Sequence, residues 1–204
     1  MCPRPTREMS ALALASLIVA PLAAQGVRAQ LGVAGSLTFP TSFYHADPNG
    51  DGFTPALHGL ALVDLKLPKT PVGLRLDLST GHNSANDSLK TRLSAAVGAP
   101  SDGKTNLLGG SVDVTYNFQP ASTVRGYLLG GIGFYRIRFS VTSRGVTVDT
   151  SATKFAWNGG AGFTYGTGVI ALFLEARYLD VGAFDTIKPT TLSTATGIRL
   201  RIGS

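Results

Sequence analysis

A histidine and a serine that could act as a base and a nucleophile lie two residues apart, at His82 and Ser84. Residues two apart on a β-strand point to the same face, so these side chains could meet over one substrate. The pair needs an acidic residue to orient the histidine. Glu175 is the only glutamate after residue 29. Strand alternation places it on the polar face of its segment, which would point into the interior of a barrel. The segment also fits a plain strand-to-loop junction, so we assign no catalytic residue and keep His82 and Ser84 as candidates.

A candidate calcium loop spans residues 47–52 (DPNGDG). Asp47, Asn49 and Asp51 supply oxygen ligands at positions one, three and five of such a loop, and glycine stands at position six. The twelfth position, where a bidentate glutamate is required, is His58. Asp, Asn, Pro and Gly all favour turns. We therefore interpret the segment as a turn and expect no metal or cofactor, with Asp47, Asn49 and Asp51 kept as calcium candidates.

Charged side chains also occur in the middle of three apolar segments. They share the polar faces of those segments, and they are Arg75, Asp77, Asp113, Glu175 and Arg177. Opposite charges can pair and satisfy one another inside a narrow barrel. One interpretation is an interior salt-bridge network that fills the barrel, and the other is a narrow polar path for small solutes.

The elements that carry these residues alternate polar and apolar residues with a period of two, which is typical of strands with two different faces. The expected strands are residues 31–39, 57–67, 72–80, 108–118, 124–141, 157–165, 170–178 and 192–202. The faces of the glycine-rich segment 124–141 stay open: either Leu128, Ile132 and Phe134 or Tyr127, Leu129 and Tyr135 point outward. Short connections alternate with longer ones, which is typical of an up-and-down outer-membrane barrel.

The apolar faces of these strands decide between a membrane barrel and a soluble one. They consist almost wholly of Leu, Val, Ala and aromatic residues, while the opposite faces carry the mid-strand charges. Aromatic residues near strand ends would form the interfacial girdle: Tyr116, Phe118, Trp157, Tyr165 and Tyr178. We predict an all-β, antiparallel, eight-stranded transmembrane β-barrel. A soluble, lipocalin-like barrel is the alternative, because alternation alone does not say which face is inside.

The first 29 residues are expected to be a cleaved secretory signal peptide, followed by one barrel domain over residues 30–204. Arg4 and Arg7 precede an apolar run over residues 11–24, which is too short for a spanning helix. Cleavage after Ala29 makes Gln30 the first mature residue, with Ala24 as the rival site. A short membrane anchor is the other interpretation. The single cysteine, Cys2, lies inside this segment, so no disulfide or thiolate site is expected afterwards.

Composition excludes several classes of protein. The 204 residues are 44% hydrophobic and 15% charged, with 25 glycines that follow no period, so disordered, collagen-like and coiled-coil chains are excluded. The net charge is +6, but the basic residues are scattered, so we expect no nucleic-acid partner. No later window is long and apolar enough for a transmembrane helix.

Three segments resemble the later strands of a known family. They are residues 125–135 (RGYLLGGIGFY), 158–163 (NGGAGF) and 173–178 (FLEARY). From residue 30 onward the chain resembles the small eight-stranded outer-membrane barrels, the group of the OmpA transmembrane domain and OmpX. This resemblance implies the outer membrane of a Gram-negative-type bacterium, a monomer, lipid contacts that include lipopolysaccharide, and an insertion machinery met in transit. The chain ends in Gly203 and Ser204, where the family usually ends in an aromatic residue.

A second, looser resemblance concerns His82 and Ser84, which look like the His-x-Ser-Asn pattern of the outer-membrane lipid A deacylases, with Ala85 in place of the asparagine. From the whole sequence we expect a non-enzymatic structural or surface-interaction role through the long loops, residues 40–56 and 81–106. The alternatives are a lipid A-modifying enzyme, a narrow pore and a soluble ligand-binding barrel.

Overall fold

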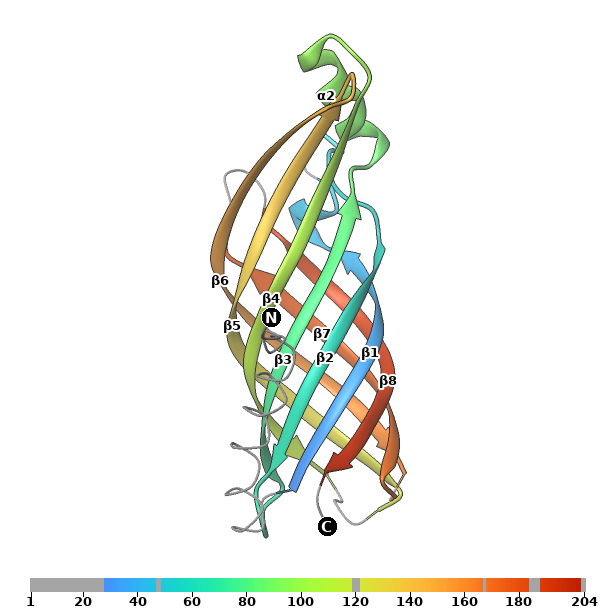
Figure 1. The fold of residues 1–204 in the computed structure, drawn as a ribbon, viewed down its shortest axis with the longest axis vertical. Coiled ribbons are helices and arrows are strands. Elements are labelled where there is room, and N and C mark those ends of the chain that lie inside the picture. Colours follow the sequence, from blue (N-terminus) through green and yellow to red (C-terminus); the bar gives the residue numbers. More distant parts are fainter. Residues whose placement is uncertain (1–27, 47–48, 119–121, 167, 184–187, 203–204) are drawn as a thin grey trace, which may run out of the picture.

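The alternating segments form eight antiparallel strands that close into a barrel (Figure 1). The structure is a computed structural model, and it describes residues 28–46, 49–118, 122–166, 168–183 and 188–202. The strands are β1 (Arg28–Pro40), β2 (Ala56–Lys66), β3 (Val72–Ser84), β4 (Ser101–Asn117), β5 (Val124–Ser143), β6 (Val146–Tyr165), β7 (Ile170–Val181) and β8 (Thr190–Ile202). Each strand pairs with the next, and β8 returns to pair with β1. The predicted fold class is therefore confirmed, while residues 1–27 of the expected signal peptide lie outside the described residues.

The strands put their apolar faces outward. Leu76, Val112, Ile132 and Leu174 are each about half exposed on the barrel exterior, while Arg75, Asp113 and Glu175 are buried in the lumen. In β5, the strand whose faces the sequence left open, Leu128, Ile132 and Phe134 are exposed. Tyr127, Leu129 and Tyr135 are buried inside. An apolar exterior around a charged interior is the inverse of a soluble barrel, so the lipocalin-like alternative is wrong.

Aromatic side chains mark the two edges of the apolar exterior. Tyr116 and Phe118 pack edge to face near one end, with Tyr165 at the same level. Phe134 contacts Phe155, and Trp157 contacts Tyr178, nearer the other end. The two edges are ten residues apart along β6, from Phe155 to Tyr165. At about 3.3 Å per residue and about 40° of tilt, this is a rise of about 25 Å, the height of the apolar band in outer-membrane barrels.

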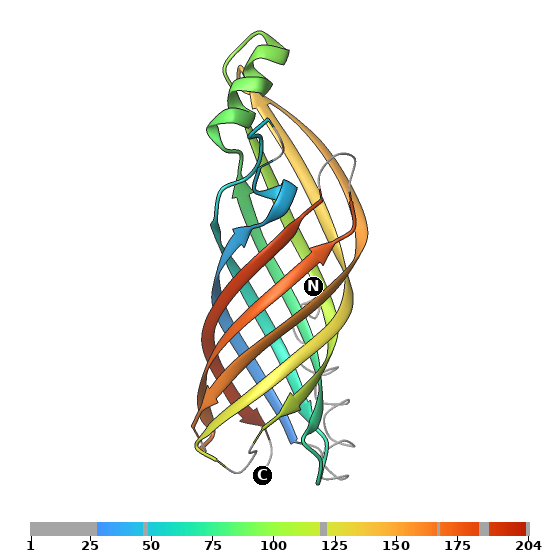
Figure 2. The same cartoon turned by 180° about the vertical axis from the view of Figure 1, so that it is seen from behind.

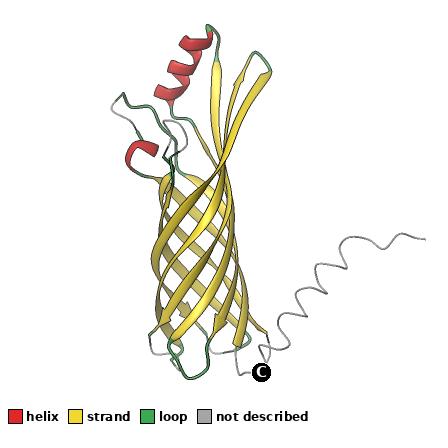
Figure 3. Ribbon diagram, turned by 90° about the vertical axis from the view of Figure 1, so that its left-hand side faces the viewer, coloured by secondary structure: helices red, strands yellow, loops and turns green. Residues whose placement is uncertain are grey.

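Three strands continue past this band, further than the sequence predicted. β5 and β6 each have 20 residues, and their hairpin projects beyond the barrel (Figure 3). β4 begins at Ser101 rather than at residue 108, and β6 begins at Val146 rather than at residue 157. The side chains of residues 146–151 are all exposed. Because both faces of this segment meet water, it has no two-faced alternation to reveal a strand.

The connection between β3 and β4 contains a helix that the sequence analysis expected only as loop. Helix α2 (Asp87–Val97) begins after Asn86, whose side chain accepts a hydrogen bond from the Leu89 amide, and ends at Gly98 with φ of 70°. Leu89 is its only buried residue. The helix therefore lacks the apolar stripe by which an amphipathic helix is recognised. A single turn of 3-10 helix, η1 (Ser42–Tyr44), lies in the β1–β2 connection, and none of the described helices is long and apolar enough to cross a membrane.

The two ends of the barrel differ. Seen from front and back, the strands tilt around the lumen, with α2 and the β5–β6 hairpin at one end and the start of β1 and the end of β8 at the other (Figures 1 and 2). The second end also has the short connections, such as residues 67–71 between β2 and β3. In outer-membrane barrels short turns face the periplasm and long loops face outward. This rule assigns α2 to the extracellular end.

Candidate functional site

The lumen is crossed by ion pairs between strands that are far apart in the sequence. The Arg75 Nε of β3 lies 2.7 Å from an Asp64 oxygen of β2, and its Nη1 lies 2.5 Å from Glu175 Oε2 of β7. Residues 75 and 175 face each other across the barrel, because β3 and β7 are not neighbours in the sheet. Arg75 thus links two walls of the lumen.

A second arginine, Arg177, gathers three carboxylates on the extracellular side of Arg75. Its Nη2 lies 2.5 Å from Asp77 Oδ2 and 2.7 Å from Glu175 Oε1, and its Nη1 lies 3.6 Å from Asp113 Oδ2. The structure thus brings together the five charged residues singled out in the sequence. Buried ion pairs are stable only when their remaining polar atoms also find partners, and much of the rest of the lumen supplies them.

Sequence reasoning missed further members of this lumen network. Arg199 of β8 lies 3.2 Å from Asp64 and donates a 2.8 Å hydrogen bond to the Tyr127 hydroxyl, which itself donates to Glu175 at 2.7 Å. Asn158 donates to Asp113 at 2.8 Å. Asp64 and Arg199 already lie on the polar faces of their segments, so alternation could have found them. Tyr127 could not be found, because the faces of its strand were open.

Inward glycines make room for these large groups. A Cβ on Gly131 would lie 2.0 Å from Asp113 Oδ1, and one on Gly162 would lie 2.5 Å from the Tyr127 hydroxyl. Any side chain at these two positions would collide with the network. At these positions the glycine-rich sequence of β5 and β6 is therefore explained by the volume of the neighbouring side chains rather than by backbone flexibility.

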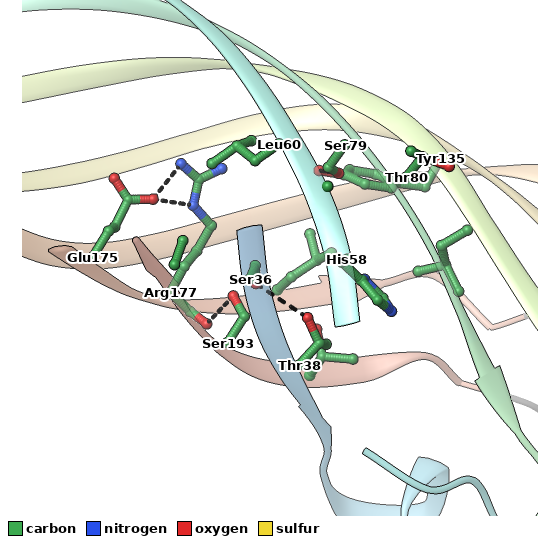
Figure 4. Close-up of a pocket in the computed structure, with 15 residues that line it drawn as sticks. Ser36, Thr38, His58, Leu60, Ser79, Thr80, Tyr135, Glu175, Arg177 and Ser193 are labelled. Carbon is green, nitrogen blue, oxygen red and sulfur yellow. Dashed lines mark hydrogen bonds and ion pairs between the residues drawn. The ribbon is translucent and has the colours of Figure 1, made fainter. Parts of the chain in front are cut away.

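Above the network, among the described residues, the lumen holds a small cavity (Figure 4). Its volume is about 50 Å³, and Arg177, Tyr135 and several hydroxyl side chains line it. This is room for about three or four water molecules. Figure 4 shows Arg177 bonded to Glu175 on one side of the cavity and Ser36 bonded to Thr38 on another. The network and this cavity leave little open space at mid-height of the described lumen.

The candidate catalytic pair lies far from this network, at the extracellular end of β3. His82 is exposed on the outer face, and Ser84 follows on the same face, as expected from alternation. Among the described residues His82 makes no side-chain hydrogen bond, and the cross-strand partners of the pair are Asn106 and Lys104. Glu175 is buried in the lumen. The described residues thus give His82 no acidic partner to orient it.

The candidate calcium loop is only partly within the described residues. Asp47 lies outside them. Asp51 is buried and forms a 2.7 Å ion pair with Arg92 of α2. Asn49 has interactions of its own. No group of three or more His, Cys, Asp or Glu side chains in the described part of the chain is placed to hold a metal ion.

The extracellular loops form a second ordered feature, which we call the apical cap. Its core consists of Tyr44, Phe53, Ala85 and Leu89, with Leu93 and Phe139 packed against them. These residues come from the β1–β2 connection, the residue after β3, α2 and the β5–β6 hairpin. The Phe53 ring packs on Tyr44 at 4.9 Å and meets Phe139 edge to face at 6.1 Å. Burial raises the pKa of the Tyr44 phenol.

Asn86 connects the cap through three hydrogen bonds. Its Oδ1 accepts from the Leu89 amide at 3.0 Å and from the Gly52 amide at 3.2 Å, and its Nδ2 donates to the Gly50 carbonyl at 2.7 Å. One side chain therefore starts α2 and fixes the β1–β2 connection beside it. The two loops expected to be contact surfaces, residues 40–56 and 81–106, are in this way joined into one body.

Comparisons with known proteins agree with this geometry. A family model described as "Outer membrane protein beta-barrel domain" matches residues 9–199. Neisserial surface protein A is similar with a TM-score of 0.54 and 19% identity, over 87% of this chain and 97% of that one. A major outer membrane protein from Thermus thermophilus is similar with a TM-score of 0.55 and 14% identity, over 85% of this chain and 99% of that one. No curated protein matches the chain.

At these identities the likeness to solved structures shows the fold alone. The family model is stronger evidence, because its match runs from residue 9 to residue 199. It therefore includes β1 to β7 and most of β8. It also agrees with the apolar exterior and its aromatic edges. The chain therefore belongs to the outer membrane protein beta-barrel domain family, and its place is the bacterial outer membrane.

Proposed function

We propose that this protein is a non-enzymatic surface protein whose sealed barrel holds the apical cap outside the cell for contact with other surfaces. The observation that carries the proposal is the core of the cap, in which Tyr44, Phe53 and Leu89 are buried above the membrane band. A loop that only closes a barrel needs no such core, whereas a rigid scaffold that presents a fixed surface does.

The tip of the β5–β6 hairpin is the part of the cap best suited to bind a protein partner. Val146 is 65% exposed and Val148 is 69% exposed, although both lie beyond the lipid-facing band. Val146 and Val148 lie two residues apart on one face, and Val141 stands opposite Val148. Apolar side chains that adjoin one another outside lipid favour a protein interface. Arg144, in the hairpin turn, donates a 3.3 Å hydrogen bond to the Gly98 carbonyl at the end of α2. The hairpin tip is thus hydrogen-bonded to the segment that ends α2.

We further propose that lipopolysaccharide contacts the barrel just above the aromatic edge that lies nearer the cap. A shallow cavity there is lined by His82, Asn106, Arg136 and Arg138, all on the outer face. Arg138 pairs with Asp149, and Arg136 donates to Ser151. Cationic side chains at the level of lipid headgroups attract phosphate groups. This contact would fix the height of the cap above the membrane.

The surface role can be tested with bacteria that display the protein and lack their own adhesins. Wild-type cells are expected to adhere to immobilised extracellular-matrix proteins more than cells with an empty vector. The double variant Val146→Ser/Val148→Ser should lose most of this adhesion, because it removes the apolar tip. Val169→Ser is the matched control, since Val169 is 67% exposed on a short turn at the opposite end.

Each displayed variant is first checked for a folded barrel by comparing the gel mobility of boiled and unboiled membranes. Adhesion of wild-type cells no greater than the empty vector would overturn the proposal. So would a Val146→Ser/Val148→Ser variant that folds and still adheres like wild type.

A further inference from the structure

At the end of the barrel opposite the cap, the lumen opens into a cavity of about 680 Å³ that is lined by cations. We call it the basic cavity. Its charged lining residues are Arg28, Lys66, Lys69, Arg125 and Arg201, and no carboxylate of the described residues lines it. Arg28 falls within the expected signal peptide, so it is set aside. Lys66, Arg125 and Arg201 come from β2, β5 and β8, three different parts of the wall.

Lys66, Arg125 and Arg201 are partly buried and have few partners among the described residues. Arg125 is 5% exposed, and its one hydrogen bond is from Nη2 to the Gly166 carbonyl at 2.7 Å. The Nε atoms of Arg125 and Arg201 are buried and have no hydrogen-bond partner among the described residues. Within the same part of the chain, Lys66, Arg125 and Arg201 form no ion pair. Guanidinium groups with unused donors beside a cavity are typical of an anion site.

The neighbouring carboxylate does not compensate for these charges. Asp64 is the acidic residue of the lumen network nearest to this end, and it is engaged by Arg75 at 2.7 Å and by Arg199 at 3.2 Å. Like charges gathered away from bulk water repel one another, and burial strengthens that repulsion. A bound anion would relieve this repulsion and satisfy the unused donors.

We propose that the basic cavity binds a phosphate-type oxyanion through Arg125, Arg201 and Lys66. Planar guanidinium forks hold tetrahedral oxyanions by paired hydrogen bonds, and the lysine adds a point charge. Two sources of this chemistry reach the periplasmic rim: free phosphate or pyrophosphate, and the phosphorylated headgroups of the inner leaflet. Tyr116 and Tyr165 belong to the aromatic edge that marks the headgroup level of that leaflet. Arg125 pairs with Thr164, the residue next to Tyr165, so the basic cavity lies at the same level. The inference is independent of the surface role proposed for the other end.

The test uses the folded barrel in an uncharged detergent at low salt. Pyrophosphate and inorganic phosphate are titrated by calorimetry, and nanodiscs of phosphatidylcholine with or without phosphatidylglycerol are compared by native mass spectrometry. We expect saturable binding to wild type that weakens at least tenfold in Arg125→Gln/Arg201→Gln. The matched control is Lys90→Gln/Lys104→Gln, which removes two cations at the extracellular end, on α2 and β4, and should bind like wild type.

The arms separate the two sources. Pyrophosphate binding without retained phosphatidylglycerol identifies a free anion, and retained phosphatidylglycerol that is lost in Arg125→Gln/Arg201→Gln identifies a lipid headgroup. If that double variant fails to fold, Lys66→Gln takes its place, because the Lys66 side chain makes no hydrogen bond on which the described fold depends. Absence of binding in both arms overturns the proposal. So does binding equal to wild type in a folded Arg125→Gln/Arg201→Gln or Lys66→Gln variant.

Discussion

At the scale of single residues, Glu175 is the centre of the lumen network. It accepts hydrogen bonds from Arg75, Arg177 and Tyr127, and it is almost fully buried. Two of these three donors are buried cations. The residue that looked from the sequence like one charge among five is therefore the one that joins the two arginines, Arg75 and Arg177.

Glu175→Gln is expected to lower the free energy of unfolding by about 3 kcal/mol, because it leaves buried arginines short of a negative charge. Urea unfolding in detergent, followed by the fluorescence of Trp157, the only tryptophan, measures this change. Asp149→Asn is the control, since Asp149 pairs with an exposed arginine on the hairpin and should leave the midpoint unchanged. Equal midpoints for Glu175→Gln and wild type would contradict the importance of the network.

At the scale of elements, the apical cap depends on how α2 begins. Asn86→Ala removes the N-cap and the two hydrogen bonds to the β1–β2 connection. We expect a loss of about 1 kcal/mol in the stability of α2 and faster trypsin cleavage after Lys90 and Arg92, while the barrel stays folded. Ser88→Ala, an exposed position in the first turn of α2, is the control. Cleavage of Asn86→Ala at the wild-type rate would mean that other contacts hold the cap.

The sequence predicted those elements whose two faces meet different surroundings. All eight strands were found where lipid lies on one side and the lumen on the other, because only there does the alternation exist. The extracellular ends of β4 and β6 were missed for different reasons. In β6, residues 146–151 are exposed on both faces. In β4, the buried face begins with Gly103 and Thr105, which give no apolar signal opposite Lys104 and Asn106. α2 was missed because Leu89 alone is buried, although Asn86 and Gly98 are a cap pair that could have revealed it. In β5 the faces could not be assigned, because both contain glycines and neither is clearly the more apolar. These glycines are Gly126, Gly130, Gly131 and Gly133.

At the scale of the whole molecule, the barrel is expected to be closed to ions. Seven charged side chains from five strands fill the middle of the lumen, and the cavity beside them has a volume of only about 50 Å³. Purified protein in planar bilayers should therefore give no stable conductance step. Steady, voltage-independent steps from protein that shows a mobility shift on boiling would favour the narrow-pore alternative instead.

The seam between β1 and β8 has a consequence for the order of events in the cell. Residues from Ala29 to Pro40 pair with residues from Ile202 back to Thr191, so the first strand made is completed only by the last. Backbone groups at an open edge have no partner in lipid. The nascent chain cannot be inserted strand by strand as synthesis proceeds. The barrel can close in lipid only once β8 is available to pair with β1.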